Sequence, residues 1–301
     1  MPNLHTTTVE LFPAAPFDFA KSVAFLGEFM PAAGEQNLDR MQITKATRLD
    51  GVTVVFRVRS TGTIAAPRLA VELFSTDPLP ADLVARLSQR IGFFLSIGDD
   101  LAPFYALGQA DPAFAPVIQQ MHGYHQVKFL TPYENAAWAI MSTRTGMPQA
   151  KQIKDRFIAA YGDAIEVDGR RYAAFPEAHD VLGASISDLE QVVGLMRRAE
   201  FIQSASRAFA TVDPAWLLAA DYDEVKAWLL TIKGIGAWGS SFILIRALGR
   251  LDRLDAPEWR LMEQVARRYS VPRDEAITRQ LAAHYGAYQG YWAHYLRAAS
   301  V

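Results

Sequence analysis

Residues 229–249 of this chain read LLTIKGIGAWGSSFILIRALG, and this stretch decides how the fold is interpreted. It predicts a helix that ends near Leu230, a tight turn through Gly234 and Gly236, and a second helix from about Ala237. Glycine permits positive φ angles and the close approach of another backbone. The first amides of the second helix have no intrahelical acceptor and lie at the positive end of its dipole. Such a hairpin can bind phosphate without reading base sequence, although two glycines are equally typical of a packed helical corner.

The composition of the 301 residues excludes several classes of site. The absence of cysteine excludes a disulfide framework, a thiolate zinc site, a cysteine nucleophile and a cysteine-ligated iron–sulfur cluster. The six histidines show no metal-ligand spacing, so we expect no metal site. A net charge of −2 argues against extensive non-specific binding to nucleic acid, but a locally basic groove and backbone amides can still bind DNA.

Two segments bear on the location of the protein. Met1 to Glu10 lack the charged and apolar regions of a signal peptide. The most apolar stretch runs from Trp228 to Ile245, but Lys233 and three glycines interrupt it, which argues against a membrane span. We therefore expect a cytoplasmic monomer without a membrane partner.

The pattern of apolar residues changes near residue 98. Before it, β-branched or alternating segments predict strands over 6–12, 41–48, 52–60 and 68–74, with Asp50-Gly51 as a hairpin turn, and helical patterns cover 17–29 and 80–94. After it, helical segments follow one another, separated by turns such as Gly162-Asp163. The predicted helices are 102–108, 111–121, 132–143, 149–161, 187–212, 214–219, 223–230, 237–248, 256–269, 273–285 and 290–299. We predict an α+β protein with a small antiparallel sheet domain over residues 1–97, helices on one face of the sheet, and an all-helical body over 98–301.

The segment Lys233–Phe242, KGIGAWGSSF, resembles the hairpin of the helix-hairpin-helix (HhH-GPD) DNA glycosylases, in particular the 3-methyladenine DNA glycosylase II branch. Further segments resemble that branch in the same order: FDF at 17–19, FL at 25–26, DLAPFY at 100–105, FLTPYENAAWAI at 129–140, FP at 175–176 and GLMRRAEFI at 194–202. The resemblance implies two helical subdomains with a cleft between them, the hairpin lying at about 224–248. It implies a nucleoid-associated base-excision repair enzyme that flips a damaged, alkylated purine out of double-stranded DNA and hydrolyses its N-glycosidic bond.

The resemblance also implies which residues bind DNA. Trp238 stands where strand-cleaving relatives carry a lysine nucleophile, which implies a monofunctional enzyme without lyase activity. Arg144 stands where relatives insert a side chain into the gap left by the flipped nucleotide, and a plain surface arginine is the alternative. No cofactor is implied apart from a monovalent cation held by hairpin carbonyls. The hairpin residues predicted to bind DNA are Lys233, Gly234, Ile235, Gly236, Ala237, Trp238 and Gly239.

A catalytic aspartate is implied at the start of the helix after the hairpin, where it stabilises positive charge on the sugar and positions the attacking water. Counting from Gly234 places this acid at Glu258, whereas the residue type favours Asp255. The structural alternative is a capping box, with Asp255 as the N-cap and Glu258 three residues later. A noncatalytic DNA-binding protein on the same scaffold is the alternative if neither acid faces the cavity.

Three aromatic residues, Phe25, Trp238 and Phe242, match positions around the base pocket of this branch. Rings there stack on an electron-poor alkylated base and gain about 0.5–2 kcal/mol from the cation–π interaction, although each ring also fits an ordinary core. A tryptophan expected near the C-terminus falls on Arg297, whose charge would repel a cationic base. This departure favours, as a further alternative, a glycosylase for oxidised or deaminated bases.

Overall fold

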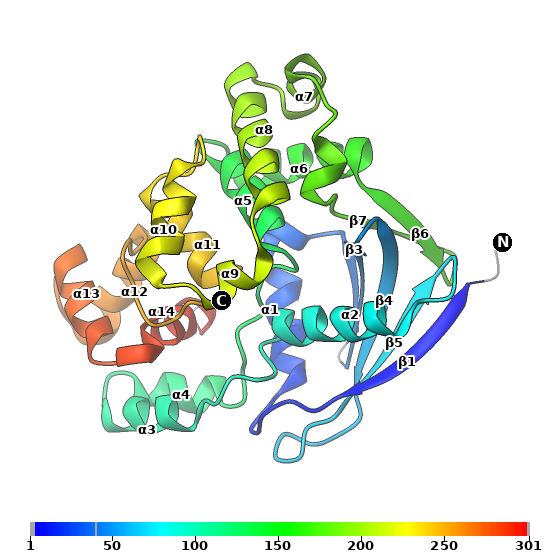
Figure 1. Ribbon diagram of the computed structural model, residues 1–301. Coiled ribbons are helices and arrows are strands. Elements are labelled where there is room, and N and C mark those ends of the chain that lie inside the picture. Colours follow the sequence, from blue (N-terminus) through cyan, green and yellow to red (C-terminus); the bar gives the residue numbers. More distant parts are fainter. Residues whose placement is uncertain (1–3, 40, 300–301) are drawn as a thin grey trace.

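Five strands near the N-terminus form one antiparallel sheet (Figure 1). The computed structural model describes residues 4–39 and 41–299, so Met1 to Asn3 of the N-terminal segment lie outside it. As predicted, Asp50 and Gly51 both have positive φ angles, 52° and 75°, and close a two-residue hairpin of type I′. The strands are β1 His5–Leu11, β2 Gln36–Asp39, β3 Gln42–Leu49, β4 Val52–Ser60 and β5 Leu69–Ser75, in the sheet order β1-β5-β4-β3-β2. Among these five strands, the short β2 is the one that was not predicted.

Two helices cover one face of this sheet, as predicted. α2 (Ala81–Phe94) buries Leu83, Leu87 and Ile91, which recur at the spacing of one helical face. α1 (Phe19–Glu28) packs into the same core beside the sheet. In Figure 1, α2 lies in front of the strands.

A second hairpin, β6 (Asp163–Val167) and β7 (Arg170–Ala174), covers the opposite face of the sheet. The prediction of a simple turn at Gly162-Asp163 was therefore wrong, and the body is not entirely helical. The two strands are short, and their stability depends on contact with β3 and β4, which local patterning does not reveal. The buried contact is made by Ala46, Val55, Ile165, Val167, Tyr172 and Ala174.

The rest of the chain is helical, and most helices agree with the prediction. The segment predicted as one helix over 187–212 is instead two, α7 (Ile186–Val193) and α8 (Met196–Thr211). Gly194 ends α7 in the left-handed conformation with φ 79°, which glycine adopts without strain. The other helices are α3 Ala102–Ala110, α4 Ala115–Met121, α5 Pro132–Ser142, α6 Met147–Tyr161, α9 Pro214–Ala219, α10 Tyr222–Thr231, α11 Ala237–Arg246, α12 Trp259–Tyr269, α13 Glu275–Ala283 and α14 Gln289–Ala298, with 3-10 turns η1 Met30–Ala32, η2 Ala178–Val181 and η3 Gly286–Tyr288.

Buried apolar side chains form two large cores. The first joins the sheet, α1 and α2 to α3, α4 and the C-terminal helices α12–α14. The second consists of α5–α11. The chain therefore leaves the first core before α5 and returns to it after α11, which creates the two predicted subdomains with a cleft between them. The division at residue 97 stays a prediction.

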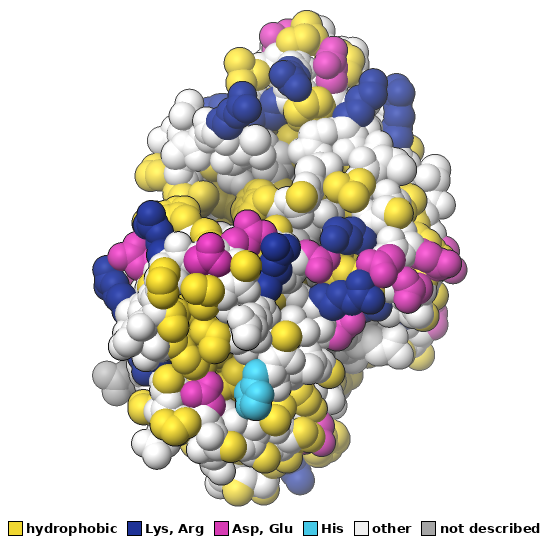
Figure 2. All heavy atoms as spheres, turned by 90° about the vertical axis from the view of Figure 1, so that its left-hand side faces the viewer, with side chains coloured by type: hydrophobic (Ala, Val, Ile, Leu, Met, Phe, Trp, Pro, Cys, Tyr) yellow, Lys and Arg dark blue, Asp and Glu magenta, His cyan; other side chains and the backbone are white. Residues whose placement is uncertain are grey.

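The surface carries no extended region of one charge on the face shown in Figure 2. Acidic and basic side chains alternate across its middle, basic side chains gather toward its upper end, and hydrophobic side chains lie in the hollow between. No described helix combines the length and the apolar character that crossing a membrane requires.

Buried ion pairs link the sheet to the second core. The ammonium group of Lys154 on α6 forms an ion pair with Glu35 Oε1 at 2.7 Å and donates to Glu134 Oε1 at 2.7 Å and to the Pro31 carbonyl at 2.8 Å. Lys45 on β3 binds the other oxygen of Glu35 at 2.8 Å. Burial alone would raise the pKa of Glu35, but the charges of Lys154 and Lys45 outweigh it and lower the pKa to about 2.

We predict that Glu35→Gln lowers the free energy of unfolding at pH 7 by about 3 kcal/mol, because it leaves buried lysines without their counter-ion. The depressed pKa of Glu35 means that its contribution is complete above about 4.5, its value in the unfolded chain, and is lost as the pH falls toward about 2. Urea unfolding at several pH values measures this loss, which should be weaker in Glu35→Gln.

The control is Glu10→Gln, because Glu10 is exposed and lies 3.9 Å from Arg68. It should change the stability by less than about 0.5 kcal/mol. Equal effects of the two variants would contradict the assigned role of the buried cluster.

Candidate active site and DNA-binding hairpin

A cavity of about 1130 Å³ lies between the two cores, with walls from α1, α5, α11, α12 and α14. On one side Phe25 and Phe29 stack with ring centres 5.3 Å apart. On another, Trp238 and Phe242 lie almost parallel at 5.1 Å. Phe129 bridges the pairs, 5.4 Å from Phe29 and 5.9 Å from Phe242. The three predicted pocket aromatics thus lie on one cavity, although α1 and α11 are far apart in the sequence.

Glu258 lies on the wall of this cavity. It occupies the N-cap position of α12, where the positive end of the helix dipole favours an anion. Its side chain makes no capping hydrogen bond and instead binds Arg297, with Oε1 2.8 Å from Nε. Both side chains remain about one third exposed, so a ligand in the cavity can reach them.

Asp255 is placed differently. Its Oδ2 lies 2.5 Å from Lys226 Nζ and accepts a hydrogen bond from the Tyr222 hydroxyl at 3.1 Å, both on α10. It is absent from the described residues that line the cavity, where Ala256 and Glu258 do occur. Because α12 begins only at Trp259, the predicted capping box of Asp255 and Glu258 does not form, and this alternative was wrong.

The floor of the cavity is polar and positively charged. Arg246, at the end of α11, donates to the Val127 carbonyl at 2.9 Å, and its Nη1 lies 3.3 Å from His294 Nδ1. The other ring nitrogen of His294 lies 2.9 Å from the Tyr124 hydroxyl. Burial, reinforced by Arg246 and Arg297, lowers the pKa of His294 well below its ordinary value, so the ring is neutral at physiological pH. Burial also lowers the pKa of Arg246, to about 10, so the guanidinium remains charged.

The hairpin between α10 and α11 has the predicted form. Gly234 has φ 89°, and a Cβ there would lie 2.4 Å from the Phe201 ring, so glycine is required for both conformation and space. Gly236 has φ −101° and does not use the positive φ that glycine permits, and a Cβ built there would meet no atom within 4 Å. Lys233, Gly234, Gly236, Ala237 and Trp238 are exposed, whereas Ile235 and Gly239 are buried within the hairpin.

The loop between α5 and α6 borders the cavity. Arg144 is exposed in this loop and has φ 53°, but it is absent from the described lining residues. Ser142 and Met147, on either side of the loop, do line the cavity, and Met147 is 45% exposed. The loop therefore lies at the mouth, with an apolar side chain rather than Arg144 closest to the cavity.

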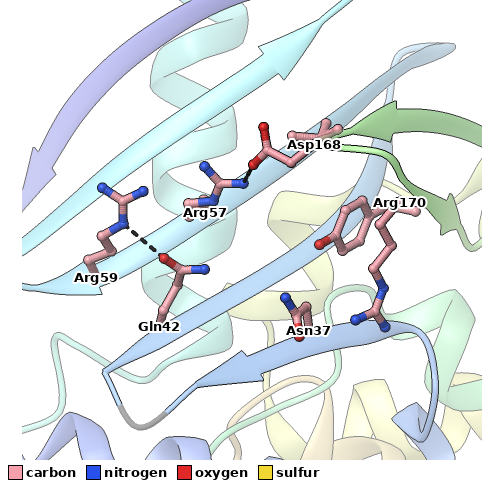
Figure 3. A pocket seen from close by; sticks show the side chains of 8 residues that line it. Asn37, Gln42, Arg57, Arg59, Asp168 and Arg170 are labelled. Atoms are coloured by element: carbon pink, nitrogen blue, oxygen red, sulfur yellow. Dashed lines mark hydrogen bonds and ion pairs between the residues drawn. The ribbon is translucent and has the colours of Figure 1, made fainter.

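A second cavity, of about 500 Å³, lies between the large sheet and the β6–β7 hairpin (Figure 3). Arg57 forms an ion pair with Asp168, and Arg59 donates to Gln42 at 2.9 Å. Arg170 donates to a backbone carbonyl of β2 at 2.9 Å. Because these arginines already have partners within the protein, this cavity is the weaker candidate for ligand binding.

Sequence reasoning missed part of the large cavity. Phe29, His294 and Arg246 all line the cavity but were not predicted to do so, and Arg246 is only 8% exposed. The signal was present, because Arg246 lies in the apolar run ILIRAL and His294 in the aromatic run YWAHYL. Polar residues inside such runs are buried and need partners.

Comparisons with known proteins agree with this geometry. A family model described as HhH-GPD superfamily base excision DNA repair protein matches residues 137–290, just over half of the chain. A DNA-3-methyladenine glycosylase of Bacillus subtilis (strain 168) is 25% identical over 179 residues, which cover 58% of this chain and 59% of that protein. The chain therefore matches about three fifths of the length of this relative.

The fold is similar to two solved structures over almost the whole chain. The 3-methyladenine DNA-glycosylase from Archaeoglobus fulgidus superimposes with a TM-score of 0.79 at 18% identity and covers 96% of both chains. The apo 8-oxoguanine glycosylase/lyase of Clostridium acetobutylicum gives 0.70 at 14% identity, with 98% of both chains covered. These identities are low, so the likeness to solved structures concerns the fold, which confirms the predicted α+β architecture. The sequence match over residues 137–290, which include the hairpin and α12, places the chain in the HhH-GPD superfamily of base excision DNA repair proteins.

Proposed function

We propose that this protein is a monofunctional DNA glycosylase that removes damaged purine bases, including alkylated ones, from double-stranded DNA. The observation that carries the proposal is the position of Glu258, an acid on the wall of an aromatic cavity that also contains Trp238 of the hairpin. The name of the Bacillus subtilis relative supports a glycosylase for alkylated bases.

The base must leave the DNA duplex to reach the cavity. The rings of Phe25 and Phe29 and those of Trp238 and Phe242 form two aromatic surfaces beside it. A flipped base can stack on such surfaces with most of its face removed from water. Stacking holds the glycosidic bond near Glu258, which lies on the same cavity.

Glu258 is the acid that we assign to the hydrolysis. The C1′–N bond breaks and its electron pair leaves with the base, so positive charge develops on the sugar. The carboxylate of Glu258 stabilises this charge, the oxygen of water bonds to C1′, and the proton of the water passes to the carboxylate. Arg297 holds Oε1 of this carboxylate and so fixes its orientation.

The hairpin binds the DNA backbone in this proposal. The amides at the start of α11 have no intrahelical acceptors, and the exposed backbone at Gly234 and Gly236 lets a phosphate come close. Lys233 adds a positive charge at the same turn. The exposed turn also fits a monovalent cation bound by its backbone carbonyls, which would add further positive charge beside the phosphate.

The side chains of the cavity favour hydrolysis without strand cleavage. Trp238 occupies the hairpin position at which an amine nucleophile would act. Lys21 lies on the described cavity wall, but its ammonium group donates to the His122 carbonyl at 2.6 Å and lies 3.6 Å from Asp18. An amine bound in this way is poorly placed to attack the sugar.

We expect Glu258→Gln to reduce the single-turnover rate of base excision by about 100-fold or more, because it removes the charge that stabilises the transition state. Its affinity for DNA that contains an abasic site should fall by less than about 3-fold, since the hairpin is unchanged. Asp255→Asn tests the other candidate and should retain most of the activity. If Asp255→Asn lost excision activity and Glu258→Gln did not, the catalytic acid would be Asp255 instead of Glu258.

A second test addresses strand cleavage. Incubation of the protein with substrate DNA and sodium borohydride should trap no covalent complex, because none of the described residues that line the cavity offers a free amine beside Glu258. Excision should leave intact abasic DNA that is cut only by later treatment with alkali. A trapped complex would contradict the monofunctional proposal, and its disappearance in Lys21→Gln would identify the amine.

The role of the hairpin is tested by Gly236→Val. Open space surrounds Gly236, so the substitution should leave the unfolding temperature unchanged while the added side chain keeps a phosphate away from the amides of α11. We expect the Kd for duplex DNA to rise about 10-fold or more in a fluorescence anisotropy titration. Gly183→Val is the matched control, because Gly183 is likewise exposed with open space around it but lies before α7. Equal DNA affinity of the two variants would exclude the hairpin as the binding element.

A further inference from the structure

The floor of the active-site cavity contains a buried cation whose hydrogen-bonding capacity is not fully used. Arg246 is 8% exposed and lines the cavity. Its two terminal nitrogens face the Val127 carbonyl and His294. Its Nε is buried and has no hydrogen-bond partner among the described residues. A buried donor without an acceptor is costly, so an acceptor atom brought into the cavity beside this guanidinium would relieve the cost.

The guanidinium group of Arg246 also contacts two aromatic rings of the cavity wall. Its central carbon lies 5.1 Å from the ring centre of Phe25 and 4.9 Å from that of Phe29. These distances are those of cation–π contacts, so the two rings already interact with a positive charge. A cationic base that enters the cavity therefore cannot gain the full cation–π energy from Phe25 and Phe29.

The groups that lie beside Arg246 in the cavity supply no unpaired negative charge. Arg297 lies on the wall, bound to Glu258, and His294 is neutral and bound to Arg246 and Tyr124. Because Arg246 donates to Nδ1 of His294, the ring carries its proton on Nε2, which faces the Tyr124 hydroxyl. Both ring nitrogens of His294 therefore have partners within the protein, and the neutral ring carries no negative charge that could attract a cationic base.

The other charged residues that line the cavity do not neutralise the positive charge of Arg246 at its floor. Lys21 binds the His122 carbonyl, and Arg260 lies over the Trp259 ring, 5.5 Å from its centre. Glu28 is exposed at the end of α1. A cationic base beside the floor would therefore meet a positive charge at Arg246 that no carboxylate balances, whereas the charge of Arg297 is balanced by Glu258.

We infer that the cavity selects uncharged damaged purines that present a hydrogen-bond acceptor, such as a carbonyl oxygen or an unprotonated ring nitrogen, over cationic methylpurines, and that Arg246 determines this specificity. The inference rests on the proposed glycosylase function and specifies its substrate class. Uncharged candidates include deaminated purines and neutral alkylation products, in which the added ring leaves no formal charge.

The test is a set of single-turnover excision assays on duplexes that differ only in the damaged base. Hypoxanthine and 1,N6-ethenoadenine represent uncharged bases with acceptors, and 3-methyladenine and 7-methylguanine represent cationic bases. Each rate is divided by the rate of spontaneous loss of that base. We expect the wild-type enhancement to be at least 10-fold greater for the better uncharged base than for either cationic one. A greater enhancement for the cationic bases would overturn the inference and leave the glycosylase function standing, whereas no excision of any base would reject the glycosylase function itself.

The variant Arg246→Met tests whether Arg246 determines the preference for uncharged bases. The variant should lose at least 10-fold in excision of the uncharged bases, and its excision of the cationic bases should stay constant or rise. Arg246→Lys, which keeps the charge but removes the planar donor group, should lose activity on the uncharged bases and still discriminate against the cationic ones. An unchanged ratio between the two classes in both variants would overturn the role of Arg246.

Arg250→Met is the matched control. Arg250 also lies over an aromatic ring, that of Tyr222, and donates to the Ala220 carbonyl at 2.8 Å, but it is outside the described cavity lining. It should leave the ratio between the two classes unchanged. Thermal unfolding and affinity for abasic DNA, measured on each variant, separate a change in specificity from a loss of folded protein.

Discussion

The cavity between the two cores depends on the burial of one charge, the ammonium group of Lys154. Its three hydrogens are matched by Glu35, Glu134 and the Pro31 carbonyl, which come from separate parts of the chain. A buried cation is tolerated only when its donors are satisfied, so these segments cannot separate without a large cost. Because Pro31 and Glu35 follow α1 directly, the cluster fixes α1, with its pocket residue Phe25, against the second core.

The cavity exists because the chain builds two cores and then returns to the first. α12 and α14 pack with the sheet and α1, while α5 and α11 belong to the other core. The two groups of helices meet at the cavity, where each contributes different chemistry. Glu258 and Arg297 come from the first group, and the hairpin with Trp238, Phe242 and Arg246 comes from the second. The aromatic rings and the cation are thereby held on helices or at their ends, and the acid at the N-cap of α12.

Local sequence patterns were sufficient where local physics determines the structure. The turn at Asp50-Gly51 needs two positive φ angles, and the hairpin needs a left-handed residue at Gly234, so both could be predicted from residue type. The β6–β7 hairpin could not be predicted in this way, because it depends on packing against the sheet. The helix break at Gly194 could not be predicted either, because a single glycine inside an apolar pattern does not by itself end a helix. Likewise, counting along the sequence pointed to Glu258 and residue type favoured Asp255, and the sequence does not show which of these side chains Lys226 binds.

The sequence by itself determined the class of this protein: the glycine turn, the amphipathic helices and the strand pattern are local features, and the order of its motifs identifies the HhH-GPD superfamily. Only the tertiary structure decided which charges enter the cavity. Arg246 is an arginine like Arg250 in the sequence, yet one is buried against Phe25 and Phe29 and the other lies outside the cavity over Tyr222. The reason is physical: the effect of a charge depends on its burial and its neighbours, and these are set by helices that meet only after the two cores have formed.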